Sequence, residues 1–310
     1  MTGAPDLSPA QRVIADARAR GVDPASDHAE IRAALDALPQ EVQHSRTWLE
    51  ASILTDLAHR ERARKVHRQL ARMRRRQHAR GAHDLFETFW GECQQILGSD
   101  TVGAHGYRPA LGGLDDATAW RDTAALVEKL EARGLTAFAN SGTLLGLVRD
   151  GGFIAHDDDI DLALVVPGAD VTEVAATWWG VRRDLLAADL LDAEFEARER
   201  LHAKARTSAG TGVDLFPAWV IDGLLWVWPH TPGAVEADRV LPPEQHRVAG
   251  ADVPVPRDPE PLLEQNYGPD WRVPDPTWSF DWKQPDDRFT PFVQAMRPDG
   301  PPARNGLPQP

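Results

Sequence analysis

The chain has 310 residues, 42% of them hydrophobic, which is enough for one large domain or two modest ones with a buried core. It carries 34 Lys and Arg against 47 Asp and Glu, a formal net charge of -13 that argues against a general nucleic-acid-binding protein. The single cysteine, Cys93, excludes an internal disulfide and any CxxC zinc or redox site. No signal-peptide pattern opens the sequence and no apolar run approaches the ~18 residues of a membrane helix, so we expect a soluble, cytoplasmic protein.

Residues 1–100 read as a helical extension. Ser8 and Pro9 form a helix start, with Gly21 where that helix ends, and 24–38 repeats the pattern. A long helix is predicted over 47–80 from a thin apolar stripe formed by Leu49, Ile53, Leu57, Val66, Leu70 and Met73.

The second half of that predicted helix is strongly basic. Its cationic residues are Arg60, Arg62, Arg64, Lys65, Arg68, Arg72, Arg74, Arg75, Arg76 and Arg80, against Glu61 alone. Such a run is either a solvated helix face or coiled arm, or a docking surface for a polyanion or an anionic membrane face. In the second case the protein would be peripheral to the inner face of the membrane.

A Gly-rich stretch at 98–113 indicates a linker, followed by a second domain over 114–285. Asp115 is predicted to cap a helix that runs to Arg133. Then come a strand (LTAFA), a short helix (GTLLGLVRD), a buried strand (IDLALVV) and a helix over 170–190.

Later strands are predicted at AEFEAR, 213–216 and 224–228, with Asp222-Gly223 as a hairpin turn between the last two. The proline-rich tail, 286–310, is predicted to be disordered. The whole pattern is that of an α+β domain with a mixed sheet, preceded by a helical extension.

Four aspartates, at positions 157, 158, 159 and 161, stand directly before the buried strand IDLALVV. Alternate side chains on a strand share a face, so Asp159 and Asp161 should point the same way. Two carboxylates ~4 Å apart repel by roughly 4 kcal/mol at an effective dielectric constant near 20, which a bound cation would relieve. Oxygen ligands at this spacing suit Mg²⁺ or Mn²⁺. Asp157 is expected in a loop, and Asp158 on the opposite face.

Three other interpretations of the aspartates fit the residues less well. An EF-hand calcium loop needs Gly at its sixth position and Glu at its twelfth, where this chain has Leu162 and Gly168. A helix N-cap cluster conflicts with the strand-like residues that follow. Simple surface acidity fits poorly with a position next to a buried strand.

Ser141, Gly142 and Thr143 follow a predicted strand and open a helix. Free backbone N–H groups and the positive end of the helix dipole favour phosphate binding at such a turn. Gly142 also lacks a side chain that would block close approach. The aspartates downstream make this weak signal more specific.

The stretch SGTLLGLVRDGGFIAHDDDIDLAL closely resembles the signature of the LicD/fukutin-type phosphotransferases, a branch of the DNA-polymerase-β-like nucleotidyltransferase superfold. GVDLFPAW, at 212–219, is similar to the family's third-carboxylate strand, and LLEQNYGPDWRVP, at 262–274, to its C-terminal Tyr-Gly…Trp…Pro segment. The resemblance covers roughly 115–280. Where the family commonly has Pro-Trp before the aspartates, this chain has Ala155-His156.

Carried over by position, the resemblance implies a metal-binding and catalytic set of Asp159, Asp161 and Asp214. It places Ser141, Gly142 and Thr143 at the phosphate-side turn, and Arg149 near the donor phosphates. Lys204, ten residues before Asp214 on a predicted neighbouring strand, is a further candidate for neutralising phosphate charge, or else an ordinary surface lysine.

The resemblance implies a nucleotidyltransferase-like mixed sheet flanked by helices and a metal-dependent reaction. In that reaction, a phospho-alcohol (phosphocholine- or polyol-phosphate-like) moves from a CDP-alcohol to a hydroxyl of a glycan or polyol-phosphate polymer at the cell surface. True nucleotidyl transfer from a nucleoside triphosphate to a small molecule, sugar phosphate or protein is the alternative. A decayed, non-catalytic scaffold is disfavoured by the complete set of three carboxylates.

Overall fold

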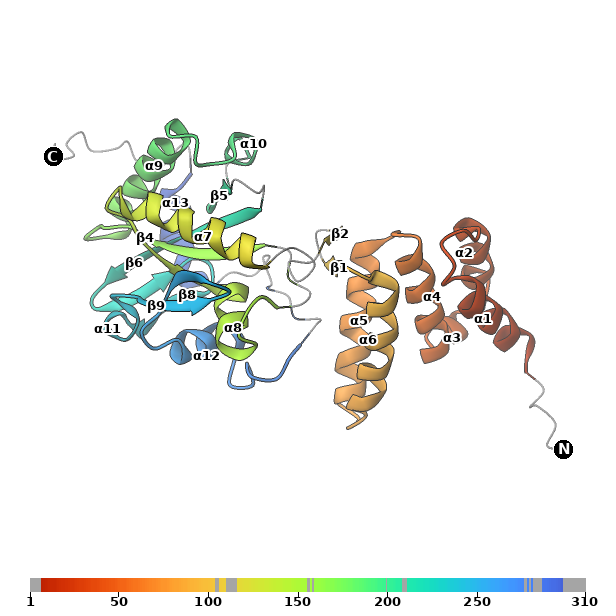
Figure 1. Ribbon diagram of the computed structural model, residues 1–310. Helices are drawn as coiled ribbons and strands as arrows, with labels where there is room; N and C mark the ends of the chain where they lie inside the picture. The colour runs from red at the N-terminus through yellow and green to blue at the C-terminus, as the bar shows by residue number, and fades with distance from the viewer. Residues whose placement is uncertain are drawn as a thin grey trace. The chain divides into compact units, whose positions relative to one another are not determined.

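The computed structural model describes residues 7–103, 106–109, 116–154, 157, 159–198, 200–207, 211–275, 278, 280 and 286–297. The chain forms two units, Met1–Ala110 with Asp275–Ser279, and Leu111–Pro274 with Phe280–Pro310 (Figure 1). Each unit has its own hydrophobic core. Within the described ranges, every helix is too short or too polar to span a lipid bilayer.

The first unit is built from helices and one hairpin. In chain order its elements are α1 (Pro9–Arg20), α2 (His28–Asp36), α3 (Gln40–Gln43), α4 (Arg46–Ala58), α5 (Ala63–His78), α6 (His83–Leu97), β1 (Asp100–Gly103) and β2 (Gly106–Pro109). Every residue from Trp48 to Leu57 is buried, so α4 forms the centre of this core. The predicted start of α1 is confirmed, since the Ser8 hydroxyl accepts from the Gln11 N–H and the Gln11 side chain accepts from the Ser8 N–H.

The single helix predicted over 47–80 is wrong, because the chain turns between α4 and α5. Arg60 and Arg62 take left-handed conformations there, with φ of 55° and 51°. The break is held from outside the helix: the Tyr107 hydroxyl lies 3.0 Å from the carbonyl oxygen of Asp56 and 2.7 Å from that of Glu61, and its single proton can be donated to either. Tyr107 lies on β2, so part of the expected linker is a hairpin of the first unit.

The second unit has the α+β organisation predicted from the sequence. Its elements are α7 (Asp116–Glu131), β3 (Thr136–Ala139), α8 (Ser141–Arg149), β4 (Ile160–Val165), α9 (Val171–Ala187), α10 (Ala193–Glu196), β5 (Ala203–Arg206), β6 (Gly212–Ile221), β7 (Leu224–Val227), β8 (Thr231–Glu236), α11 (Ala237–Val240), β9 (Glu244–Val248), β10 (Ala251–Val255), α12 (Glu260–Tyr267), η2 (Asp287–Phe289) and α13 (Thr290–Ala295). The predicted cap, Asp115, lies outside the described residues.

The main sheet of this unit is mixed, with the strand order β3-β4-β6-β7-β8. β3 and β4 are antiparallel, and β4 and β6 are parallel. β5 pairs with the first half of β6, and β7 with its second half. The Asp222-Gly223 hairpin is confirmed, with positive φ at both residues. Because β6 is central, its first half meets both β4 and β5, and the candidate site lies there.

Two sequence predictions for this unit are wrong. AEFEAR was expected to be a strand, but it begins with α10, which is capped by Asp192: this side chain accepts from the N–H groups of Glu194 and Phe195. The tail was expected to be disordered from residue 286, but Asp286–Arg297 contains η2 and α13. Phe289, Phe292 and Met296 are buried in the core of the unit. Burial of these three side chains is the physical reason for their order.

Candidate active site

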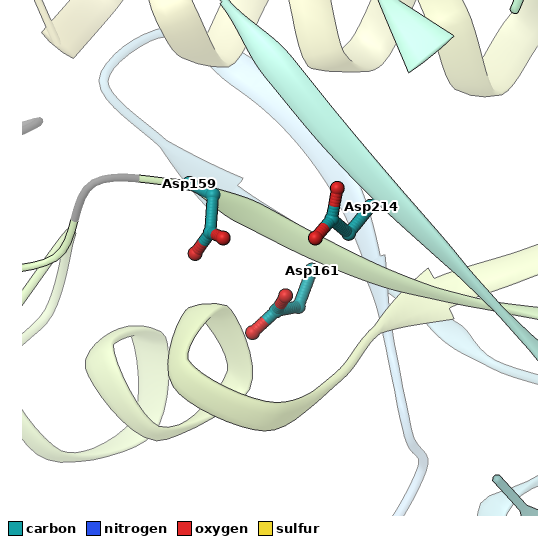
Figure 2. A group of neighbouring side chains, drawn as sticks. All are labelled: Asp159, Asp161 and Asp214. Carbon is teal, nitrogen blue, oxygen red and sulfur yellow. The ribbon is translucent and has the colours of Figure 1, made fainter. Parts of the chain in front are cut away.

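Three carboxylates converge at the start of the parallel pair β4 and β6. Asp161 lies opposite Asp214 in the register of these strands, and Asp159 directly precedes β4. One carboxylate oxygen from each residue lies within 4.8 Å of the others. Figure 2 shows the three side chains gathered beside the first turn of α8. The family resemblance grouped these three residues, and the fold brings them together.

The start of α8 holds Asp161 in place. The Asp161 N–H donates to Thr143 Oγ1 at 2.8 Å, and its Oδ2 accepts from the Gly142 N–H at 3.1 Å. The Asn140 N–H donates to the Asp161 carbonyl at 3.0 Å. Two of these bonds fix the backbone of Asp161 and one fixes its carboxylate, so Gly142 and Thr143 are its positioning residues.

The backbone at the start of α8 is tightly constrained. Ser141, the first residue of the helix, has φ of 43°, a conformation that non-glycine residues adopt rarely. A Cβ on Gly142 would lie 2.5 Å from Asp157 Oδ2 and 3.6 Å from Asp161 Oδ2. Glycine is needed here because two carboxylates approach the backbone closely. Local strain of this kind is common at functional sites.

The loop between α8 and β4 is packed against the rest of the unit. A Cβ on Gly146 would lie 2.4 Å from the carbonyl oxygen of Gly152, so helix and loop touch through backbone. Phe153 stacks on Trp120 of α7, with ring centroids 3.9 Å apart. This packing fixes the position of the backbone just before the aspartates.

Asp157 belongs to this loop, as the sequence predicted, and its N–H donates to the Ile154 carbonyl at 2.9 Å. Ala155, His156 and Asp158 lie outside the described residues. The expected direction of Asp158 therefore stays a prediction.

The electrostatics of the site favour a bound cation. The pKa of Asp161 is raised well above its usual range, first by burial, then by the charges of Asp159, Asp157 and Asp214. The hydrogen bond from Gly142 opposes this shift only in part. Carboxylate oxygens crowded in this way are the ligands that hard divalent cations prefer. The donor set therefore fits a metal ion.

Asp214 has a basic neighbour on the adjacent strand. Lys204 stands opposite it in the β5–β6 pairing, and its Nζ lies 2.6 Å from Asp214 Oδ1. The sequence left Lys204 as either a phosphate-neutralising group or a surface lysine. Its place at a buried carboxylate puts it within the candidate site.

His202 is a site residue that the sequence reasoning missed. Its Nε2 lies 3.7 Å from Asp214 Oδ2, and its ring stacks on Phe216 with centroids 5.2 Å apart. Burial is the main reason that its pKa falls to about 3, with smaller effects from nearby cations such as Lys204. The imidazole is therefore neutral near pH 7. The available signal was its position two residues before Lys204, directly before β5.

Arg149 and Tyr267 lie within electrostatic reach of the carboxylates. The Arg149 guanidinium donates two hydrogen bonds, each of 2.8 Å, to the carboxylate of its neighbour Asp150. The pKa of Tyr267, at the end of α12, is raised mainly by burial and then by Asp161 and Asp157, while Arg149 lowers it. The sequence singled out the segment of Tyr267 by its resemblance, but assigned that tyrosine no role.

Comparison with known proteins agrees with this geometry. Residues 134–258 match the family model described as LicD/FKTN/FKRP, nucleotidyltransferase domain. The matched range contains β3, α8, β4 and β6, and with them all three converging carboxylates. No curated protein matches the chain. Residues 134–258 therefore form a nucleotidyltransferase domain of the LicD type, and the LicD family is generally phosphotransferase-like.

Proposed function

We propose that this protein is a metal-dependent phosphotransferase. It moves a phospho-alcohol, phosphocholine- or polyol-phosphate-like, from a CDP-activated donor to a hydroxyl of a glycan or cell-surface polymer. The observation that carries the proposal is the convergence of Asp159, Asp161 and Asp214 within the family's nucleotidyltransferase domain.

The carboxylates are proposed to hold Mg²⁺ or Mn²⁺. When bound, the metal supplies positive charge that neutralises the donor diphosphate and the leaving CMP. Asp161 and Asp214 offer buried oxygens from paired strands, and Asp159 offers a less buried one. A substrate phosphate would then approach from the side of Asp159, the least buried of the three.

The remaining residues are proposed to position the donor and the acceptor. Ser141, Gly142 and Thr143 lie where the positive end of α8 faces the carboxylates, which favours the donor diphosphate there. Lys204 adds a fixed positive charge beside Asp214, and Arg149 contributes a second one nearby. Asp214 is the candidate base for the acceptor hydroxyl, since proton removal is needed as that oxygen attacks phosphorus.

The alternative is nucleotidyl transfer, in which a nucleoside monophosphate moves from a triphosphate to an acceptor. The same carboxylates serve both reactions, because the two differ only in which bond of the donor breaks. Our proposal rests on the family for this choice.

Product analysis separates the two reactions. The full-length protein is incubated with Mg²⁺, a candidate glycan acceptor and either labelled CDP-alcohols or nucleoside triphosphates. Release of CMP with labelled alcohol phosphate on the acceptor supports the proposal, whereas release of pyrophosphate from a triphosphate supports nucleotidyl transfer. Asp161→Asn should abolish turnover, while Asp184→Asn, at an exposed position on α9, should not.

A further inference from the structure

The first unit contains a pocket of about 480 Å³ at the start of α5. We call it the basic pocket. Four of its six lining residues are cationic and none is acidic; the lining consists of Arg62, Ala63, Arg64, Lys65, Arg68 and Gly106. Its volume lies within the range of small-molecule sites. In a chain with a net charge of -13, such a concentration of positive charge is a specific local feature.

Three cations of the basic pocket, Arg62, Lys65 and Arg68, have little or no compensating negative charge among the described residues. Lys65 and Arg68 form no ion pair with any described residue. Arg62 lies 3.8 Å from Asp36, but that carboxylate already accepts from Arg32 at 2.6 Å. Outside the pocket, another cation of the predicted basic run has a nearby acidic partner: Arg60 forms an ion pair with Asp100 at 2.9 Å. The pocket therefore has positive charge available for a ligand.

The pKa of Lys65 is sensitive to its surroundings in the basic pocket. Its pKa is lowered, mainly by burial and then by the charges of Arg62 and Arg32, while Asp36 and Asp56 act against the shift. An anion in the pocket would stabilise the charged ammonium.

The packing of α5 favours a soluble ligand over a membrane. Its apolar residues Val66, Leu70 and Met73 are all buried in the core of the first unit. Among the described side chains of α5, no large hydrophobic residue is exposed. A helix that binds in a membrane interface needs a free apolar face to insert between the lipids. In α5 the apolar face is buried in the core of the first unit, and the exposed side chains are polar or charged.

We propose that the basic pocket binds a compact anion that carries two or more phosphate groups. Arginine recognises phosphate oxygens through paired hydrogen bonds, and lysine adds a mobile point charge. The four cations at positions 62, 64, 65 and 68 carry more positive charge than a single phosphate group, with a charge of about −2, would neutralise. This site is separate in chemistry from the carboxylates and does not depend on the transfer reaction proposed for them.

Calorimetric titration of the full-length protein with inorganic tripolyphosphate tests the proposal. EDTA is included, so that no metal ion can bridge the probe to the carboxylates. The pocket variant is Arg64→Gln/Lys65→Gln/Arg68→Gln. The matched control is Arg72→Gln/Arg75→Gln/Arg76→Gln, which removes the same charge from exposed positions of the same helix, outside the pocket lining.

We expect the wild type to bind, and tripolyphosphate to bind more tightly than orthophosphate. The pocket variant should weaken the affinity by about tenfold or more, and the control by less than about threefold. No binding by the wild type, equal weakening by the two variants, or equal affinity for orthophosphate would each overturn the proposal.

A second arm uses sedimentation with phosphatidylglycerol vesicles. Vesicle binding that is lost in the pocket variant, without tripolyphosphate binding, would replace the compact anion with a membrane surface and so refute the proposal. Thermal unfolding checks that all variants are folded. If the triple variant is not, single Lys65→Gln and Arg68→Gln substitutions should each still weaken the binding of tripolyphosphate.

Discussion

Lys204 Nζ lies 2.6 Å from Asp214 Oδ1, and the two residues face each other across the antiparallel pair β5 and β6. The ammonium neutralises one of three converging carboxylates, so part of their mutual repulsion is relieved within the protein itself. A cation bound by the same carboxylates would share Asp214 with Lys204. This pair therefore links the stability of the fold to the occupancy of the site.

Replacing Lys204 with Met should destabilise the metal-free protein by about 1–3 kcal/mol, since it leaves a mostly buried carboxylate without its partner. Saturating Mg²⁺ should restore more stability to this variant than to the wild type, because the metal takes over the neutralising role. Thermal unfolding with and without metal measures both effects. Lys129→Met, at an exposed position on α7, is the control and should change neither. A metal response that is the same in wild type and Lys204→Met would contradict the shared role of Asp214.

Gly146→Ala should cost about 1–3 kcal/mol of stability, because the new methyl group would meet the Gly152 backbone at 2.4 Å. The matched control is Gly180→Ala in α9, where a Cβ meets nothing within 4 Å. There the substitution should stabilise by ~0.5–1 kcal/mol, since alanine is the better helix former. Chemical denaturation compares the two. Opposite signs are expected, and two changes of the same sign would mean that α8 and its loop are not in close contact.

Thr143→Val should leave the N–H of Asp161 without an acceptor, which costs about 1–3 kcal/mol for a buried group. Activity should fall as well, because Asp161 loses one of its positioning bonds. Thr143→Ser keeps the hydroxyl and should retain most of both properties. Unfolding free energies and kcat for the two variants decide the matter, and a serine variant as impaired as the valine variant would argue for a role of the methyl group instead.

His230 provides a test of pH dependence. Burial lowers its pKa to about 3, from an unfolded value near 6.5. The unfolded chain therefore binds more protons between these values, so this residue's contribution is fully present above pH ~6.5 and is lost as the pH falls toward 3. Between pH 7 and pH 5, the wild type should lose about 2 kcal/mol more than His230→Gln. Denaturant unfolding at both pH values measures this difference, and identical losses would show that His230 does not stay neutral in the fold.

Much of the site was predictable because its signals are local. The turn at Ser141, the short helix after it and the strand after the aspartates all follow from residue types and spacing. The pairing of Asp161 with Asp214 could not be predicted from the residues alone, since it depends on the register of two strands more than 45 residues apart. Only the resemblance joined these two residues in advance.

The failed predictions have different physical causes. The break between α4 and α5 contains neither Gly nor Pro, and it is held by Tyr107, about 45 residues further along the chain. Tertiary contacts of this kind leave no local signal. By contrast, Asp192 before α10 is a recognisable N-cap. Phe289, Phe292 and Met296 recur at helical spacing, so the order of this part of the tail could have been predicted.

The measurement that tests the central claim most directly is the affinity of the full-length protein for Mn²⁺, determined by electron paramagnetic resonance or calorimetry. We predict that the wild type binds the metal and that Asp159→Asn, Asp161→Asn and Asp214→Asn each weaken binding strongly. Each should also lower kcat on the order of 10³-fold, while Asp157→Asn and Asp158→Asn cost much less. Asp159→Asn and Asp161→Asn should retain the folded state, since each removes a repelling charge. Asp214→Asn also removes the partner of Lys204, so thermal unfolding is used to check that this variant is folded. Metal affinity unchanged in all three variants, or absent from the wild type with and without nucleotide, would contradict the assignment of these carboxylates as the catalytic metal site.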